Sequence, residues 1–301
     1  MPLSMWLPTT YSAASAPVAA LFAVMTKVGV HAVLRVHGVV FGEGAGESAF
    51  AARGLLLPLA LATSVVGVLG ALAAHSLPRL VAWLTVSSVG TILIAVGLYN
   101  AAAWSAAMYY LASSTLVIAG LFLLSELVAA QRGDVADRLV PASEVAQPVL
   151  LGLLLLLLGA ASVAGLPPTP GFIGKLMVLE SAIDHPWVIP VWTVVLAVGF
   201  CSLLGLARAG SILFWAVRDE PHVGAASGAS PRMLAATCAL LGASVLMSAL
   251  AAPLKRYTDA AAAQLLDRAV YSVAVLGVQG GQGGDLADTA RPYRGQPEPS
   301  R

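Results

Sequence analysis

Long apolar stretches separated by short polar segments dominate the chain. Crossing a bilayer as a helix takes about 18 or more mostly apolar residues. Six unbroken stretches meet that length, at approximately 17–41, 54–75, 78–100, 103–130, 187–217 and 231–252. Another apolar stretch, 149–182, is interrupted by prolines. This pattern predicts an all-α integral membrane protein with about seven transmembrane helices, one of them broken at Pro167–Pro170.

The interruption reads Gly165-Leu-Pro-Pro-Thr-Pro-Gly-Phe-Ile-Gly-Lys175. Proline lacks a backbone donor and clashes with the preceding turn, so a continuous helix cannot pass through this segment. Glycine permits sharp bends and close approach of neighbouring groups. We therefore expect a helix break formed by Gly165, Pro167, Pro168, Pro170, Gly171 and Gly174. Irregular backbone at membrane depth usually lines a buried functional site.

The segments flanking the apolar stretches divide the chain further. Residues 1–16 form a lead-in containing Pro and Ser, which we interpret as the end of a missing helix. A transmembrane bundle is expected over 17–253. In 254–276 apolar and charged residues interleave, which predicts an amphipathic helix at the membrane interface. The Gly-, Pro- and Asp-rich residues 277–301 predict a disordered tail.

Composition excludes several classes of protein. The chain is 58% hydrophobic and only 10% charged, whereas soluble domains carry about 25% charged residues. The formal net charge of +1 gives no indication of nucleic-acid binding. Cys201 and Cys238 both lie in apolar stretches, where we interpret them as packing residues rather than a disulfide or metal pair. No phosphate-binding, dinucleotide-binding or metal-binding pattern occurs, so we expect no cofactor.

The distribution of lysines points to chemistry inside the membrane. The chain has three lysines, and Lys27 and Lys175 fall within predicted spans while Lys255 does not. A charge at the centre of a transmembrane helix costs about 2.5–3.5 kcal/mol on insertion scales, and such residues often mark proton paths. Lysine can lose its proton, whereas arginine stays charged. We therefore take Lys27 and Lys175 as candidate proton carriers.

Each candidate also has a structural explanation. A lysine near a helix end can extend to the interface, which applies to Lys175 if the break is a turn between two spans. His31 and Arg35 follow Lys27 at one-turn intervals on the same helical face. His31 is either a relay partner or a satisfied core residue, and Arg35 is more often an interfacial anchor. Arg208 either pairs structurally or supports transport. Ser113 and Ser114 either line a water path or let helices pack closely.

Several motifs in fixed order resemble one known family. The chain is similar to the antiporter-like membrane subunits shared by respiratory complex I and the multisubunit Mrp/Pha cation/proton antiporters, and to the D-type subunit of the latter in particular. The residues that carry the resemblance are Trp6-Leu-Pro8, Ala16-Pro-Val18, Thr26-Lys-Val-Gly29, Ser87-Ser-Val-Gly90, Gly165-Leu-Pro-Pro168, Gly171-Phe-Ile-Gly-Lys175, Ala207-Arg-Ala-Gly-Ser211, Phe214-Trp215, Tyr257-Thr-Asp259, Gln264-Leu-Leu266 and Tyr271.

The resemblance implies a fold and a set of roles. Family members have fourteen helices in two inverted five-helix repeats, so this chain would begin at the end of the seventh helix. Lys27 would be the relay lysine of the eighth helix and Lys175 the lysine of the broken helix. The family commonly has a histidine within the segment that reads Tyr110-Leu-Ala-Ser-Ser114 here, and an aromatic residue in place of His31. Members work with other membrane subunits, and we expect a bacterial inner membrane.

Three interpretations of function remain open from the sequence. The first is a membrane subunit of a monovalent cation (Na⁺ or K⁺)/proton antiporter that carries protons along intramembrane lysines. The second is a proton-pumping membrane-arm subunit of an NADH:quinone or hydrogenase redox complex, which would use the same residues. The third is an inactive truncated fragment. The motifs similar to the D-type antiporter subunit favour the first.

Overall fold

Helices account for nearly all of the ordered structure. The computed structural model describes residues 6–39, 41, 52–141, 145, 147–216 and 230–267, and these contain no β-strand. The described elements are α1 (Trp6–Ala13), α2 (Ala16–Val39), α3 (Arg53–Leu72), α4 (Leu77–Gly97), α5 (Ala101–Ala129), η3 (Gly133–Val135), α6 (Pro148–Leu154), η4 (Leu155–Ala161), α7 (Ser162–Ala164), α8 (Pro170–Ser181), α9 (Val188–Phe214), α10 (Pro231–Ala249) and α11 (Ala251–Leu266).

The predicted spans are present as helices. Among the described residues, α2, α3, α4, α5, α9 and α10 are each long and apolar enough to cross a membrane. The interrupted span is formed from two pieces. The first piece runs over Pro148–Ala164 through α6, the π-helical η4 and α7, and the second is α8. The prediction of an all-α membrane protein with one broken helix is therefore confirmed.

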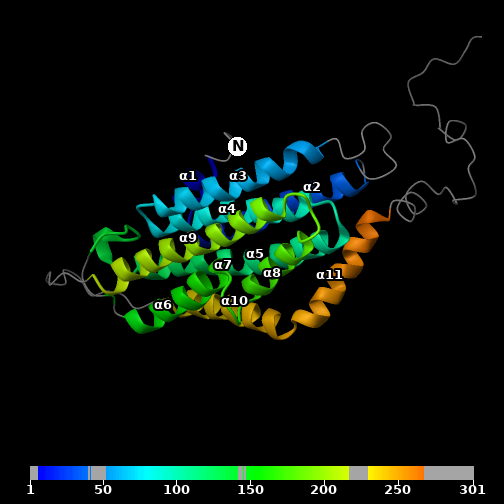
Figure 1. Cartoon of the computed structure of the whole chain (residues 1–301). Coiled ribbons are helices and arrows are strands. Elements are labelled where there is room, and N and C mark those ends of the chain that lie inside the picture. Colours follow the sequence, from blue (N-terminus) through cyan, green and yellow to red (C-terminus); the bar gives the residue numbers. More distant parts are fainter. Residues whose placement is uncertain are drawn as a thin grey trace, which may run out of the picture.

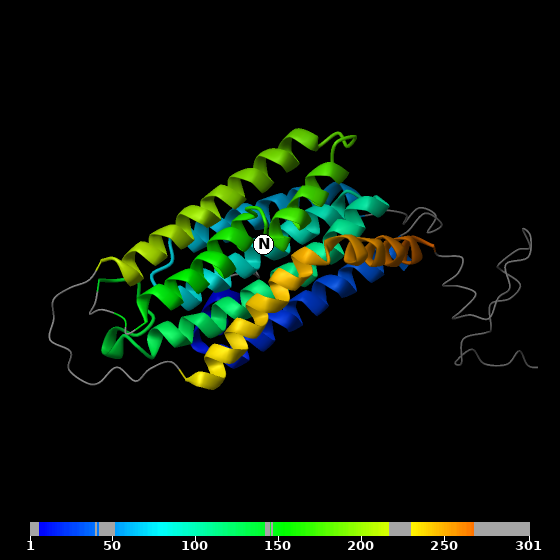
Figure 2. The same cartoon turned by 90° about the horizontal axis from the view of Figure 1, so that it is seen from below.

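The bundle is built around α4 and α5. In the most apolar part of α4, 83% of the residues are buried, and in that of α5 the share is 72%. Helix α5 packs against α2, α4, α8, α10 and α11, while α3 lies along the other side of α4. Figure 1 shows α3, α4, α5 and α9 running in roughly the same direction, and in Figure 2 α10 and α11 follow one another across one face of the bundle.

Small residues bring α3 and α4 into close contact. A side-chain carbon added at Gly67 would lie 2.5 Å from the backbone nitrogen of Ser87. One added at Gly90 would lie 2.5 Å from the backbone nitrogen of Ser64. The Oγ of Ser87 donates to the Ser64 carbonyl at 3.2 Å. Small residues at such positions let transmembrane helices approach and hydrogen bond, so Ser87 has a packing role.

The outward faces of the bundle are apolar. Leu21, Met25 and Val28 on α2 are exposed, as are Ile189 and Phe200 on α9. Large exposed apolar surfaces mark contact with a membrane or another protein. Because both the interior and the exterior of these helices are apolar, a simple apolar-in, polar-out pattern does not describe them.

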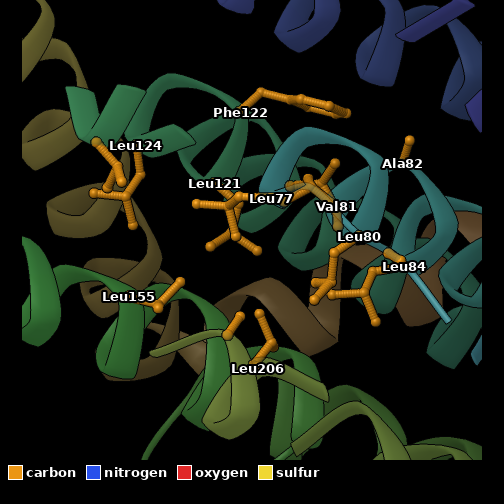
Figure 3. Packing of buried hydrophobic residues seen from close by; sticks show 14 of the residues in the cluster. Leu77, Leu80, Val81, Ala82, Leu84, Leu121, Phe122, Leu124, Leu155 and Leu206 are labelled. Atoms are coloured by element: carbon orange, nitrogen blue, oxygen red, sulfur yellow. The ribbon is translucent and has the colours of Figure 1, made fainter. Parts of the chain in front are cut away.

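The buried apolar residues form two separate cores along the length of the bundle. One core contains buried residues of α4 between Leu77 and Val86, the second half of α5, α6, η4 and the end of α9. Figure 3 shows part of this core. The other contains the end of α4, the first half of α5, α8 and the start of α9. Between them lies a layer with buried polar side chains, at Lys27, Ser64, Ser87, Ser88, Thr91, Ser113, Ser114, Ser162, Lys175 and Ser202. We call this the polar layer.

Helix α11 follows α10 after a single intervening residue, close to the boundary expected at residue 254. It packs against α5 and α2. On its inner side the Oγ of Ser105 donates to the Asp259 carboxylate at 2.6 Å, and Asp259 also pairs with Lys255 at 2.9 Å. Its position at the membrane interface stays a prediction. The predicted tail, 277–301, lies outside the described residues, as do 268–276.

Candidate functional site

Lys27 is buried at the middle of α2. Its side chain is 2% exposed, and its Nζ donates to the Oγ of Ser88 on α4 at 2.5 Å. The Ser88 hydroxyl in turn donates to the Thr85 carbonyl at 2.8 Å. Lys27 therefore does not extend to the interface. The two adjacent serines make different contacts, because Ser87 donates to Ser64 on α3 whereas Ser88 accepts from Lys27 on α2.

The helix break places a second lysine in the interior. The first half of the broken helix ends at Ala164, Gly165 takes a left-handed conformation with φ of 81°, and α8 begins at Pro170. Lys175, one turn and a half into α8, is 7% exposed. Its Nζ donates to the carbonyl oxygens of Val163 at 2.7 Å and Ala164 at 3.1 Å. A cation is favoured at a helix C-terminus, where carbonyl groups lack partners.

The prolines explain why these two carbonyls are available. In an α-helix each carbonyl accepts from the N–H four residues later. The donors for Val163 and Ala164 would be residues 167 and 168, which are prolines and have no N–H. The Leu166 carbonyl, whose donor would be Pro170, accepts instead from the Thr169 amide and hydroxyl. The break thus leaves two buried acceptors, and Lys175 satisfies both.

The glycines of the break allow close contacts. A side-chain carbon at Gly171 would overlap the Ser162 carbonyl oxygen, and one at Gly174 would lie 3.0 Å from the ring of Tyr110. These contacts hold α8 against the first half of the broken helix and against α5. The predicted roles of Gly165, Gly171 and Gly174 in forming the break thus have a steric basis.

A small cavity in the polar layer lies between the partners of the two lysines. It is lined by Ser88, Tyr110, Ser113, Ser114, Val117, Ile118, Ser162, Val163 and Gly171. Ser88 is the acceptor of Lys27 and Val163 is an acceptor of Lys175. About 10 Å³ of the cavity is open to the centre of a water molecule, which is near the minimum for one water. Ser and Tyr hydroxyls can both donate and accept hydrogen bonds, although the surface that the cavity exposes is almost entirely apolar.

Neither lysine has a carboxylate partner in the described part of the chain. The ion pair that occurs there joins Lys255 to Asp259, away from the polar layer. Removing a charge from water is costly unless it is paired, and one general resolution is that the group gives up its proton. Through their hydrogen-bond partners Ser88 and Val163, the two lysines therefore border the same small cavity without a carboxylate beside either of them in the described residues.

The other predicted residues lie outside the polar layer, except for two serines. Ser113 and Ser114 are among the residues that line the cavity, and their hydroxyls donate to the Tyr110 and Leu111 carbonyls of their own helix. His31 is exposed on α2, where it lines an open apolar groove together with Lys27 and Val28. Arg35 is exposed one turn further along. Arg208 is exposed on α9 and donates to the Leu72 carbonyl at 2.7 Å, at the end of α3.

Sequence reasoning missed Ser162 and Tyr110 as cavity residues. Ser162 lies three residues before Gly165, and its position just ahead of the break was the available signal. Tyr110 stands in the segment where the resemblance indicates a histidine, and its phenol interacts with Thr91. Glu126 near the end of α5 accepts from the Ala16 amide at 2.9 Å and caps the first turn of α2, as a structural partner rather than a member of the polar layer.

Comparison with known proteins relates this arrangement to a family. Residues 1–204 match the family described as "NADH:quinone oxidoreductase/Mrp antiporter, TM". The chain is 36% identical to the D-type subunit of a probable K⁺/H⁺ antiporter of Rhizobium meliloti, over 91% of this chain and 55% of that protein. It is 37% identical to an N-type subunit of the NADH-quinone oxidoreductase of Solidesulfovibrio magneticus, over 62% of this chain and 40% of that protein.

The fold is also found among solved structures. A chain of the Mrp complex from Dietzia sp. DQ12-45-1b superposes with a TM-score of 0.75 at 24% identity, covering 92% of this chain and 58% of that one. The chain thus spans about half the length of the antiporter subunits that it matches. The matched family, the identity over most of the chain and the shared fold agree, and the chain belongs to the NADH:quinone oxidoreductase/Mrp antiporter transmembrane family.

Proposed function

We propose that this chain is a membrane subunit of a monovalent cation/proton antiporter and that it carries protons through the polar layer between Lys27 and Lys175. The cavity that joins Ser88 to Val163 is the observation that carries this proposal, because it connects the hydrogen-bond partners of both lysines. The carriers would act by reversible protonation. His31 would take part only by exchanging protons with Lys27 through the open groove that both residues line.

Relatives support the class of transport. Similar proteins are named subunits of K⁺/H⁺ and Na⁺/H⁺ antiporters, with matches over 91% of this chain. We infer that this chain assembles with other membrane subunits, because a similar fold occurs in a multisubunit Mrp complex. The relatives are bacterial, which favours a bacterial inner membrane.

A redox-driven role is the alternative, and it too has a specific observation in its favour. NADH-quinone oxidoreductase subunits match 62% of this chain at up to 37% identity. The same lysines would then move protons, with the driving force supplied by electron transfer elsewhere in the complex. The longer match to antiporter subunits makes exchange of a cation the preferred function.

Reconstitution of the assembly that contains this chain separates these functions. In proteoliposomes carrying an internal pH dye, an inward Na⁺ or K⁺ gradient should drive proton efflux, and NADH with a quinone should not. Proton movement on NADH oxidation without a response to cations would support the redox function. No proton movement in either case would support an inactive chain and overturn both transport functions.

A further inference from the structure

The broken helix presents a pair of oxygen ligands, and the cation that they hold in this structure is the ammonium group of Lys175. The Val163 and Ala164 carbonyls have no backbone donors, because the residues that would supply them are Pro167 and Pro168. Both oxygens accept from the Lys175 ammonium, at 2.7 and 3.1 Å. Carbonyls at the ends of broken membrane helices are common ligands of Na⁺ in transporters. We refer to these two groups as the carbonyl pair.

Glycines on two elements allow close packing around the carbonyl pair. A side-chain carbon at Gly199 on α9 would lie 2.8 Å from the Ala164 oxygen and 3.3 Å from the Lys175 Nζ. One at Gly165 would lie 2.9 Å from the Lys175 Cδ. A side chain at either position would therefore crowd whichever cation lies at the carbonyl pair.

Residues that carry hydroxyl groups lie near the carbonyl pair. Val163 is part of the lining of the small cavity, together with Ser113, Ser114 and Ser162. Monovalent cations in membrane proteins exchange their hydration shell for protein oxygens. In this structure the Val163 and Ala164 carbonyls are the oxygens that hold a cation, the Lys175 ammonium.

The charge at this place belongs to Lys175 alone. The elements packed against α8 carry few titratable groups, and none of these is hydrogen bonded to the Lys175 ammonium in the described residues. They are Tyr109, Tyr110 and Glu126 on α5, Glu180 on α8 itself, Cys201 and Arg208 on α9, and Arg232 and Cys238 on α10. A neutral Lys175 would thus leave the carbonyl pair with its oxygen dipoles and without a counter-charge.

We propose that the carbonyl pair is a monovalent-cation site that the protonated Lys175 and a Na⁺ or K⁺ ion occupy in alternation. The exchange balances: the ammonium releases one proton to water and becomes a neutral amine, and one cation takes its place at the carbonyls. The local charge is +1 in both states. The proposal deepens the proposed function, on which it rests, by placing the coupling of the two ions at one site.

Cation binding to the purified assembly tests this directly. Equilibrium binding of ²²Na⁺ and of ⁸⁶Rb⁺, as a K⁺ substitute, is measured over a pH series, and the protons released on adding each salt are followed with a pH dye. Binding should strengthen as pH rises, with about one proton released for each ion bound at this site. The Lys175→Ala assembly should retain binding and lose its pH dependence, because no ammonium competes.

A pair of glycine variants tests the location. Gly199→Ala crowds the carbonyl pair and should weaken binding by about tenfold, as an overpacked contact does. Gly205→Ala on the same helix is the matched control, because the nearest atom to its added carbon is 3.6 Å away, and binding should be unchanged. Size-exclusion chromatography confirms that both assemblies are intact.

Three results would overturn the site, two of them in variants. One is unchanged binding in Gly199→Ala, and the other is the same pH dependence in Lys175→Ala as in the unmodified assembly. Release of no protons by either salt in the unmodified assembly, which needs no variant, would overturn it as well. Lys27→Ala separates this site from the proton path, since it should stop transport and leave cation binding intact.

Discussion

The Nζ of Lys27 and the Oγ of Ser88 lie 2.5 Å apart at the middle of the bundle, and they join α2 to α4. Ser88 is also part of the lining of the cavity that reaches Val163, the acceptor of Lys175. This one hydroxyl therefore connects the first lysine to the rest of the polar layer. Removal of the Ser88 hydroxyl should therefore have a large effect on transport, although the group is a single oxygen atom.

Ser88→Ala leaves the Lys27 ammonium buried without its acceptor, which costs about 1–3 kcal/mol. We expect the rate of cation-driven proton transport in proteoliposomes to fall by about tenfold or more. Ser87→Ala is the matched control, because its hydroxyl donates to Ser64 on α3 and not to Lys27. Equal effects of the two substitutions would show that Ser88 has only a packing role.

Lys27→Arg should strongly impair transport, because arginine keeps the charge and cannot give up its proton. Loss of a proton-transferring group typically costs about 100-fold or more in rate. Lys255→Arg, at an exposed lysine paired with Asp259, should transport normally. Proton flux is measured with a pH dye after a Na⁺ or K⁺ jump. Normal flux in Lys27→Arg would mean that Lys27 supplies a structural charge.

Lys175→Ala should abolish proton coupling while the assembly still forms. The small side chain leaves the carbonyls of Val163 and Ala164 without the ammonium that satisfies them. Co-purification of the other subunits measures assembly, and the pH dye measures coupling. Antiport retained in this variant would exclude Lys175 as a proton carrier.

Gly171→Ala should destabilise the bundle by about 3 kcal/mol or more, because its side-chain carbon would overlap the Ser162 carbonyl oxygen. The midpoint of thermal unfolding in detergent reports the change. Gly242→Ala on α10 adds the same carbon where nothing lies within 4 Å, so it should leave the midpoint unchanged. A stable Gly171→Ala protein would show that α8 can move away from the first half of the broken helix.

The contact between α11 and α5 should weaken in acid. Burial opposes ionisation of Asp259, but hydrogen bonds from Lys255 and Ser105 and the Lys255 charge outweigh it and hold the pKa of this carboxyl below its usual value. A lowered pKa means that the stabilisation is present above the usual aspartate pKa of about 4 and is lost as pH falls through the lowered value.

Hydrogen exchange of the α11 amides measures this loss of contact. In the unmodified protein, protection should decrease as pH falls below about 4, after correction for the intrinsic exchange rate. Asp259→Asn should have low protection at neutral pH and show no further decrease attributable to this residue. An identical acid response in both proteins would place the titrating group elsewhere.

The sequence predicted the apolar spans, the place of the break and the burial of Lys27, because long apolar runs and prolines have strong local consequences. It left open whether Lys175 is buried or extends to the interface. It could not tell which face of each helix points inward. A transmembrane helix is apolar both toward lipid and toward its neighbours, so His31 and Lys27, one turn apart, gave the same signal although only Lys27 is buried. The cavity depends on contacts among α4, α5 and the broken helix, which no single segment encodes.

The two apolar cores on either side of the polar layer form two successive barriers to protons. Packed Leu, Val and Ala side chains exclude water, so a proton in the layer is separated from the solutions on both sides of the membrane. If protons pass through the layer as proposed, one core must loosen at a time, because loosening of both would let protons flow freely down their gradient. Substitutions that create space within the first core, at Leu84 or Leu121 for example, should thus cause a leak of protons before they cause a loss of exchange.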